Sequence, residues 1–133
     1  MSKSAPDANS RILLTDSYEE IKAKIRISVT DSIPGITHDP INRPGTSNLL
    51  TILSACLGEE VSLTAERYRE KNHGVLKADV VEALAEMLKG PRDEILRLRK
   101  DEGYLKGVVD EGARKAREIS EKTMVEVRAK VGL

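Results

Sequence analysis

The first seven residues place a lysine between small hydroxyl side chains. Lys3 stands between Ser2 and Ser4, and Pro6 favours a loop over a helix at this point. A loop of this composition can close over a phosphate chain, because an ammonium group and several hydroxyl or amide donors then meet the phosphate oxygens. A lysine so placed stabilises the negative charge that grows on those oxygens during transfer. For these seven residues alone, the alternative is a disordered tail.

Basic side chains gather in two stretches of the C-terminal third, one after Pro91 and one on the last predicted helix. They are Arg92, Arg97, Arg99 and Lys100 in the first stretch, and Arg114, Lys115, Arg117 and Lys122 in the second. Such groups can contact nucleic-acid phosphates, which fix the position of a nucleic acid without reading its sequence. Carboxylates are interleaved with them, so the alternative for each residue is an ordinary solvated helix face.

A third segment, Arg43-Pro44-Gly45-Thr46-Ser47-Asn48, precedes an apolar helical pattern. Its helix start could offer free amides to an anion. In the structural interpretation, which we favour, the proline and glycine set a turn while Thr46 or Ser47 caps the helix.

The histidines and the cysteine do not suggest a metal site. A single cysteine, Cys56, excludes an intrachain disulfide framework and a cysteine-based zinc site. His38 and His73 lie far apart in the sequence without paired ligands nearby. Because Cys56 lies among Ile52, Leu53 and other aliphatic residues, we expect a buried small hydrophobe rather than a reactive thiol.

The elements that must position these groups are expected to be helical. With 133 residues the chain is long enough for one core, and its three aromatic residues, all tyrosines, leave the packing to aliphatic side chains. Lysine plus arginine and aspartate plus glutamate each number 22, so the zero net charge excludes chain-wide attraction to nucleic acid or anionic membrane. The apolar runs are too short to span a bilayer, and no secretory or transit segment is recognisable.

Apolar spacing and capping signals give the helices. Ser17 and Glu20 form a capping box before a helix over residues 18–29, and turn residues fill the loop 30–45. We predict the remaining helices at 47–57 (ended by Gly58), from Ser62 to Asn72, from Val75 with a kink or a restart at Pro91, and at 110–131, which is expected to be the best-formed helix.

The N-terminal end and the overall class follow from this pattern. His73-Gly74 is expected to turn the chain, and residues 12–14 form a short apolar run that predicts a brief strand. The predicted fold class is mainly α: a bundle of four to six helices with a short loop-and-strand N-terminal tail.

Several segments, taken in order, resemble a known family. Met1 to Ser4 matches the last four letters of Lys-Met-Ser-Lys-Ser, the ATP loop of class I aminoacyl-tRNA synthetases. Further segments resemble bacterial-type tryptophanyl-tRNA synthetases in order and spacing: Pro6-Asp7, Ile12-Leu13-Leu14-Thr15-Asp16, Lys24-Ile25-Arg26, Val29-Thr30-Asp31-Ser32, Asp39, Arg43-Pro44-Gly45-Thr46-Ser47-Asn48-Leu49-Leu50, Lys77-Ala78-Asp79, Glu111-Gly112-Ala113-Arg114-Lys115-Ala116 and Val131-Gly132-Leu133. The resemblance spans the whole chain and separates this family from the tyrosyl enzymes.

This resemblance implies a reaction and a set of partners. The parent enzyme would activate tryptophan with ATP and Mg²⁺ and transfer it to tRNA(Trp), and it would be a homodimer. Met1, Ser2, Lys3 and Ser4 would bind ATP, with Lys3 as the catalytic lysine that contacts the phosphates as pyrophosphate departs. The C-terminal helices would approach the anticodon end of the tRNA through the basic residues named above.

The resemblance also implies a division of the chain and a place of action. Residues 1–16 would hold the loop and the end of a nucleotide-binding domain, and residues 17–133 would form the helical tRNA-binding domain. The nucleotide-binding half is not in this sequence, so we expect residues 1–133 alone to be inactive. The alternative is a stand-alone, non-catalytic helical binding module with a synthetase-derived fold. Bacterial cytoplasm and mitochondrial matrix are both consistent with the sequence, and no membrane association is expected.

Overall fold

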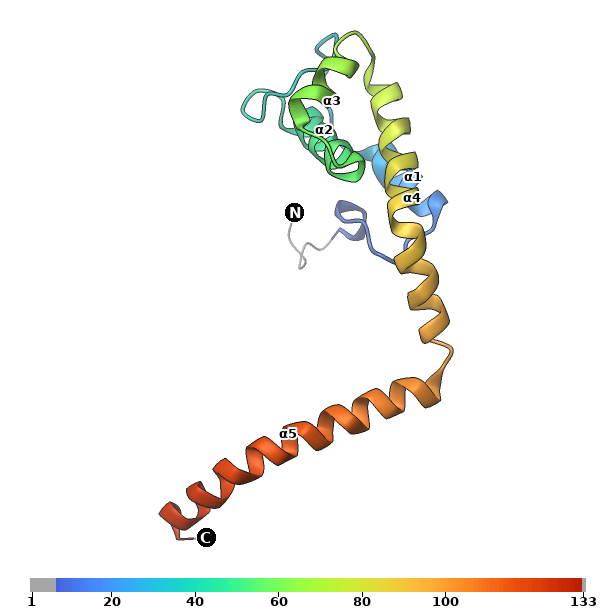
Figure 1. The fold of residues 1–133 in the computed structure, drawn as a ribbon. Helices are drawn as coiled ribbons and strands as arrows, with labels where there is room; N and C mark the ends of the chain where they lie inside the picture. Colours follow the sequence, from blue (N-terminus) through green and yellow to red (C-terminus); the bar gives the residue numbers. More distant parts are fainter. Residues whose placement is uncertain (1–6, 133) are drawn as a thin grey trace. The chain divides into compact units, whose positions relative to one another are not determined.

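The computed structural model describes residues 7–132, which form one short 3₁₀ helix and five α-helices (Figure 1). The elements are η1 (Ala8–Ser10), α1 (Tyr18–Ile27), α2 (Pro44–Leu57), α3 (Val61–Tyr68), α4 (His73–Leu98) and α5 (Glu102–Val131). The chain divides into two compact units, the first ending at Asp93 and the second beginning at Glu94. The predicted mainly-α class is confirmed. The boundary proposed at residues 16 and 17 stays a prediction.

Helix α1 begins as its sequence predicts. The Ser17 side chain accepts a hydrogen bond from the Glu20 amide, and the Glu20 carboxylate accepts one from the Ser17 amide, which completes the capping box. Two exposed amides at the helix start are thereby satisfied. Ile21 and Ile25, four residues apart, then lie on one face and are both buried.

The core of the first unit is built from the aliphatic side chains of α1, the loop before α2, α2 and α4, together with Tyr68 of α3. Helices α2 and α3 lie next to each other, and both contribute to the same core as the first half of α4 (Figure 1). The buried core residues are Ile21, Ile25, Ile36, Leu49, Leu50, Leu53, Tyr68, Leu76, Val80 and Val81. Each fully buried leucine or isoleucine contributes roughly 1.5–3 kcal/mol relative to an exposed one.

The start of α2 differs from the prediction. The helix begins at Pro44, with Arg43 as the N-cap residue and no side-chain cap, so Thr46 and Ser47 lie inside the helix rather than at its cap. Proline suits the first helical position because it has no amide N–H, and an N–H at that position would have no partner within the helix. A Cβ at Gly45 would lie 2.1 Å from the carbonyl oxygen of Val29, so only glycine fits this close backbone approach.

Helices α3 and α4 also start differently from the prediction. The N-cap residue of α3 is Glu60 rather than Ser62, and His73 and Gly74 are the first residues of α4 rather than a turn before it. The Asn72 side chain accepts from the Val75 amide and so satisfies a donor at this helix start. Helix α4 continues past Pro91 to Leu98, so the predicted restart is wrong.

The tyrosine that ends α3 is bonded to α4. The Tyr68 hydroxyl donates to Asp79 at 2.5 Å, and the Lys71 ammonium lies 4.0 Å from the centre of the Tyr68 ring. Burial and the bond to Asp79 raise the pKa of Tyr68 to about 12. The phenol therefore stays protonated and keeps donating at neutral pH.

The predicted strand at residues 12–14 is wrong, since this segment forms a turn and the described part of the chain has no strand. The Asp16 amide donates to the Leu13 carbonyl, and the Asp16 carboxylate accepts from the Leu13 amide at 2.8 Å. These two bonds close the turn, so the Leu13 amide and carbonyl are not free to pair with a strand.

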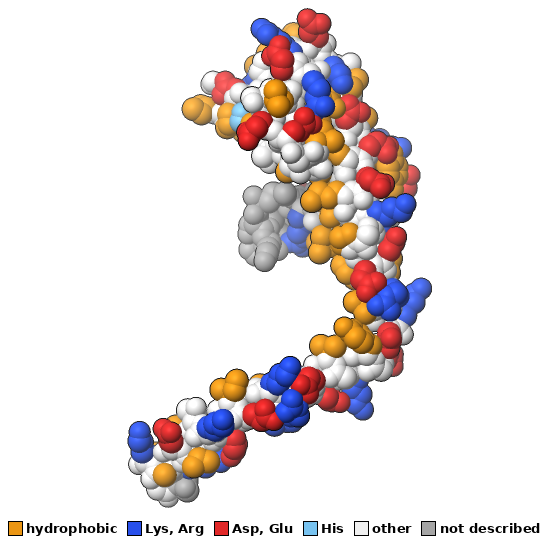
Figure 2. Space-filling view, in the orientation of Figure 1, with side chains coloured by type: hydrophobic (Ala, Val, Ile, Leu, Met, Phe, Trp, Pro, Cys, Tyr) orange, Lys and Arg blue, Asp and Glu red, His pale blue; other side chains and the backbone are white. Residues whose placement is uncertain are grey.

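The second unit consists of the end of α4 and helix α5. The Asp101 carboxylate caps α5 by accepting from the Tyr104 amide, and Gly132, with φ 79°, ends it. The helix predicted at 110–131 is confirmed, but it begins earlier, at Glu102. Helix α5 buries no residue, and Figure 2 shows hydrophobic side chains spaced along it between charged ones.

Candidate functional site

The predicted ATP loop, Met1 to Ser4, lies outside the described residues. The chain is described from Asp7, whose carboxylate accepts from the Asn9 amide at 2.8 Å and caps η1. Ser10 donates its hydroxyl proton to the Asp7 carbonyl at 2.7 Å. These local bonds shape the segment that follows the predicted loop.

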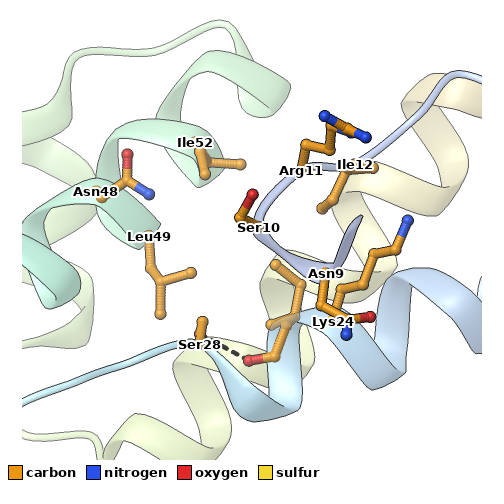
Figure 3. Close-up of a pocket in the computed structure, with 10 residues that line it drawn as sticks. Asn9, Ser10, Arg11, Ile12, Lys24, Ser28, Asn48, Leu49 and Ile52 are labelled. Carbon is orange, nitrogen blue, oxygen red and sulfur yellow. Dashed lines mark hydrogen bonds between the residues drawn. The ribbon is translucent and has the colours of Figure 1, made fainter. Parts of the chain in front are cut away.

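This segment lies against α1 and α2 across a small crevice, shown in Figure 3. The crevice has a volume of about 80 Å³ and is lined by Asn9, Ser10, Arg11, Ile12, Lys24, Ile25, Ser28, Asn48, Leu49 and Ile52. A wider crevice of about 330 Å³ shares six of these residues and extends to Asp7 and Val29. Two crevices therefore lie where residues 7–10 meet helices α1 and α2.

Asp16 holds the other end of this segment firmly. Its side chain is 5% exposed and accepts from the Lys24 ammonium at 2.5 Å, in addition to the Leu13 amide. Its backbone carbonyl accepts from the Arg92 guanidinium of α4 at 3.0 Å. We call Asp16, Lys24 and Arg92 the Asp16 cluster. It connects the N-terminal segment to α1 and to α4 within the first unit.

A second cluster surrounds the buried residue Arg43, whose side chain is 5% exposed. Its guanidinium donates through two nitrogens to the Asp31 carboxylate, at 2.7 to 3.1 Å. It also donates to the Thr37 hydroxyl and to the carbonyls of Ile33 and Gly35. We call this the Arg43 network. It fixes the loop between α1 and α2, because a planar guanidinium supplies several donors in one fork.

Thr46 and His73 complete the Arg43 network. The Thr46 hydroxyl donates to Asp31 at 2.6 Å and lies 3.0 Å from the Nε2 atom of His73. Since the hydroxyl has one proton and gives it to Asp31, its contact with His73 is a hydrogen bond in the tautomer that carries the ring proton on Nε2. His73 thereby bonds the start of α4 to the start of α2.

The carboxylates of the loop between α1 and α2 titrate at low pH. The hydrogen bonds from Arg43 and Thr46 hold the pKa of Asp31 well below its usual range, and those from Asn42 lower the pKa of Asp39. A carboxylate whose pKa is lower in the folded state stabilises the fold above its unfolded pKa of about 3.9, and this stabilisation is lost as the pH falls further.

We therefore expect the melting temperature to change little between pH 7 and pH 5 and to fall below about pH 4, where an unfolded aspartate takes up its proton. In an Asp31→Asn variant the part of this fall that belongs to Asp31 is absent, so its melting temperature depends less on pH between 5 and 3. Thermal unfolding followed by circular dichroism measures both slopes. Equal slopes would contradict the role given to Asp31.

The predicted tRNA-contacting residue of the first unit, Arg92, is half-buried and bonded to Asp16. In the second unit three predicted residues are engaged in surface ion pairs: Arg97 with Glu94, Arg114 with Glu111 and Glu118, and Lys115 with Glu111. Arg99, Lys100 and Arg117 are exposed, and their side chains form no bond within the described residues. Lys122 is exposed in the same way.

The remaining candidates carry no catalytic geometry. His38 is exposed and 3.4 Å from the Thr51 hydroxyl, while burial raises the pKa of the half-buried Cys56 thiol. Among residues 7–132, the histidine, cysteine, aspartate and glutamate side chains form no group of three that could hold a metal ion. No helix in the same range combines the length and apolar composition needed to cross a membrane.

Two groupings were not predicted from the sequence: the Arg43–Asp31 pair and the Lys24–Asp16 pair. One signal pointed to the first, since a helix starting at a proline leaves the preceding arginine without a capping role. Lys24 and Asp16 are eight residues apart, across a turn and a capping box. Their pairing depends on how the turn at residues 13–16 packs against α1, and the sequence spacing does not indicate this packing.

The chain belongs to the class I tRNA synthetases for tryptophan and tyrosine, since the sequence model described as tRNA synthetases class I (W and Y) matches residues 1–89. Within this family the chain is similar to tryptophan–tRNA ligases, in their C-terminal part.

Two relatives and one solved structure illustrate this similarity. The tryptophan–tRNA ligase of Clostridium acetobutylicum is 37% identical over 132 residues, which are 99% of this chain and 39% of the relative. The mitochondrial tryptophan–tRNA ligase of Saccharomyces cerevisiae is 39% identical over 134 residues, 99% of this chain and 35% of the relative. The crystal structure of tryptophanyl-tRNA synthetase from Mycoplasma pneumoniae superposes with a TM-score of 0.69 and 26% identity, over 100% of this chain and 40% of that one. The chain thus spans about two fifths of the length of these proteins.

Proposed function

We propose that this chain forms the C-terminal part of a tryptophan–tRNA ligase, which activates tryptophan with ATP and Mg²⁺ and transfers it to tRNA(Trp). The observation that carries the proposal is the similarity to tryptophan–tRNA ligases at 35–41% identity, over 99–100% of the chain in most of the relatives. The matched relatives are bacterial and mitochondrial, so the ligase acts in bacterial cytoplasm or in the mitochondrial matrix. The parent ligase is a homodimer.

Within this function, Lys3 stabilises the phosphates as pyrophosphate leaves, and Met1, Ser2 and Ser4 shape the ATP loop. Activation needs no nucleophile from the protein, because the tryptophan carboxylate attacks the α-phosphate of ATP and pyrophosphate leaves. The chain spans about two fifths of the length of its relatives, so the chemistry depends on the loop together with the rest of the ligase, and residues 1–133 alone are inactive. Residues 1–16 belong to the catalytic half, and residues 17–133 belong to the tRNA-binding half.

The second unit meets tRNA phosphates through its cations. Arg99, Lys100 and Arg117 are the first choice, because they have no acidic partner in the described part of the chain. Arg97, Arg114 and Lys115 would have to exchange a glutamate for a phosphate. Replacing the glutamate by a phosphate costs little free energy, since an exposed ion pair contributes only about 0.2–1 kcal/mol.

Tryptophan-dependent exchange of pyrophosphate into ATP tests the proposal, with the full-length protein that carries these residues beside residues 1–133 alone. We expect exchange by the full-length protein and only background by residues 1–133. Exchange by the short chain clearly above background would contradict its inactivity. A full-length protein without exchange would contradict the enzyme and favour the alternative, a non-catalytic helical binding module.

A further inference from the structure

We infer that Lys24 and Arg92 are positioning residues for tryptophan activation, because they hold Asp16 and thereby fix the segment that leads to the ATP loop. The inference rests on the proposed function of that loop. It assigns Arg92 to the activation step, which needs no tRNA, instead of to tRNA binding.

The first argument is the burial of the cluster. The side chains of Lys24 and Asp16 are only 13% and 5% exposed and are 2.5 Å apart. The Asp16 carboxylate is paired with the Lys24 ammonium and also accepts from the Leu13 amide. Removing either charge would leave the other one buried without its counter-ion. The turn at residues 13–16 is therefore fixed on α1.

The second argument is the direction in which Arg92 donates. Its guanidinium reaches the carbonyl of Asp16 from α4, across 76 residues of sequence. The Nη1 atom of Arg92 therefore bonds α4 to the N-terminal segment within the first unit. This carbonyl belongs to the main chain of the N-terminal segment, so the bond holds the backbone of that segment in place at Asp16.

The third argument is the contrast along the segment. At Asp16 the chain is held by Lys24 of α1, by Arg92 of α4 and by the Leu13 amide of its own turn, whereas between Asp7 and Ser10 it borders crevices of about 80 and 330 Å³. The Asp16 cluster fixes this segment at its C-terminal end, where α1 and α4 both bond to it. Releasing it lets the segment shift into the crevices, and displacing a catalytic group by about 1 Å can cost as much as 100-fold in rate.

The variants Lys24→Met and Arg92→Gln in the full-length ligase test this inference by pyrophosphate exchange in the absence of tRNA. We expect kcat for exchange to fall roughly 10- to 100-fold with the KM for tryptophan unchanged, because the loop, not the tryptophan pocket, is displaced. Lys24→Arg keeps the cation and should restore most of the rate. Arg92→Gln removes one hydrogen bond at a half-buried position, so that variant is expected to fold.

Matched controls are Lys22→Met on α1 and Lys89→Gln on α4, both exposed and without an ion pair in the described residues. They should leave exchange unchanged. If Arg92→Gln raises the KM for tRNA in aminoacylation while exchange is unaffected, Arg92 is a tRNA contact and the inference is overturned. If both cluster variants keep full exchange while Lys3→Ala loses it, the inference fails and the proposed function stands. If Lys3→Ala also keeps full exchange, the role proposed for Lys3 and the ATP loop fails, and the inference fails with it, while the exchange itself still supports a tryptophan–tRNA ligase.

Discussion

Replacing Arg43 by methionine is expected to lower the free energy of unfolding by roughly 3 kcal/mol, near the low end for a broken buried ion pair. The low end applies because the Asp31 side chain keeps 19% exposure. The variant leaves Asp31 with the Thr46 hydroxyl, the Ile33 amide and the more distant His73 ring at 3.8 Å, and it leaves the carbonyls of Ile33 and Gly35 without the Arg43 donor. Urea or thermal unfolding followed by circular dichroism measures the change.

Arg69→Met is the matched control for Arg43→Met. The Arg69 side chain is 68% exposed, and within residues 7–132 it pairs only with Glu66, at 3.4 Å. Exposed pairs contribute about 0.2–1 kcal/mol, so this variant should change stability little. Arg43→Lys should recover only part of the loss, because an ammonium cannot reproduce the fork that reaches Asp31 and the carbonyls together. If Arg43→Met destabilises no more than Arg69→Met, the Arg43 network does not hold the loop.

The helices of this protein follow from local sequence, and the predictions reflect that. The capping box of Ser17 and Glu20 and the stop at Gly58 depend on residues within one helical turn, so their types and spacing were sufficient. The start of α2 was misjudged because two capping candidates, Thr46 and Ser47, follow a proline. Their hydroxyls serve the loop instead: Thr46 donates to Asp31, and Ser47 accepts from the Asp39 amide.

The candidate site was less predictable, because its contacts join distant residues. Arg92 is a cation in a basic stretch, and nothing near it in sequence indicates that its partner is a carbonyl 76 residues earlier. Helix α5 illustrates the same limit. Its apolar spacing predicts a helix correctly, but Val109 and Ile119 are 68% and 74% exposed. Periodicity places the apolar side chains on one face of a helix and does not specify whether another element packs on that face.

Lys3 differs from the residues of the Asp16 cluster in what its loss should do. Lys3→Ala in the full-length ligase is expected to reduce kcat for pyrophosphate exchange roughly 10²- to 10³-fold, as for the loss of one transition-state donor. If Lys3 acts only as pyrophosphate leaves, kcat and kcat/KM for ATP fall together. Steady-state exchange at varied ATP measures both.

A control variant and the KM for ATP show whether Lys3 acts on the transition state. Lys22→Ala also removes one positive charge, but from an exposed position on α1, and it should not alter exchange. A higher KM for ATP with unchanged kcat would mean that Lys3 binds ground-state ATP and does not stabilise the transition state. Lys3→Arg keeps a cation but changes its shape, so we expect only partial activity. In the Asp16 cluster, by contrast, Lys24→Arg should restore most of the rate, because there the cation only has to hold a carboxylate.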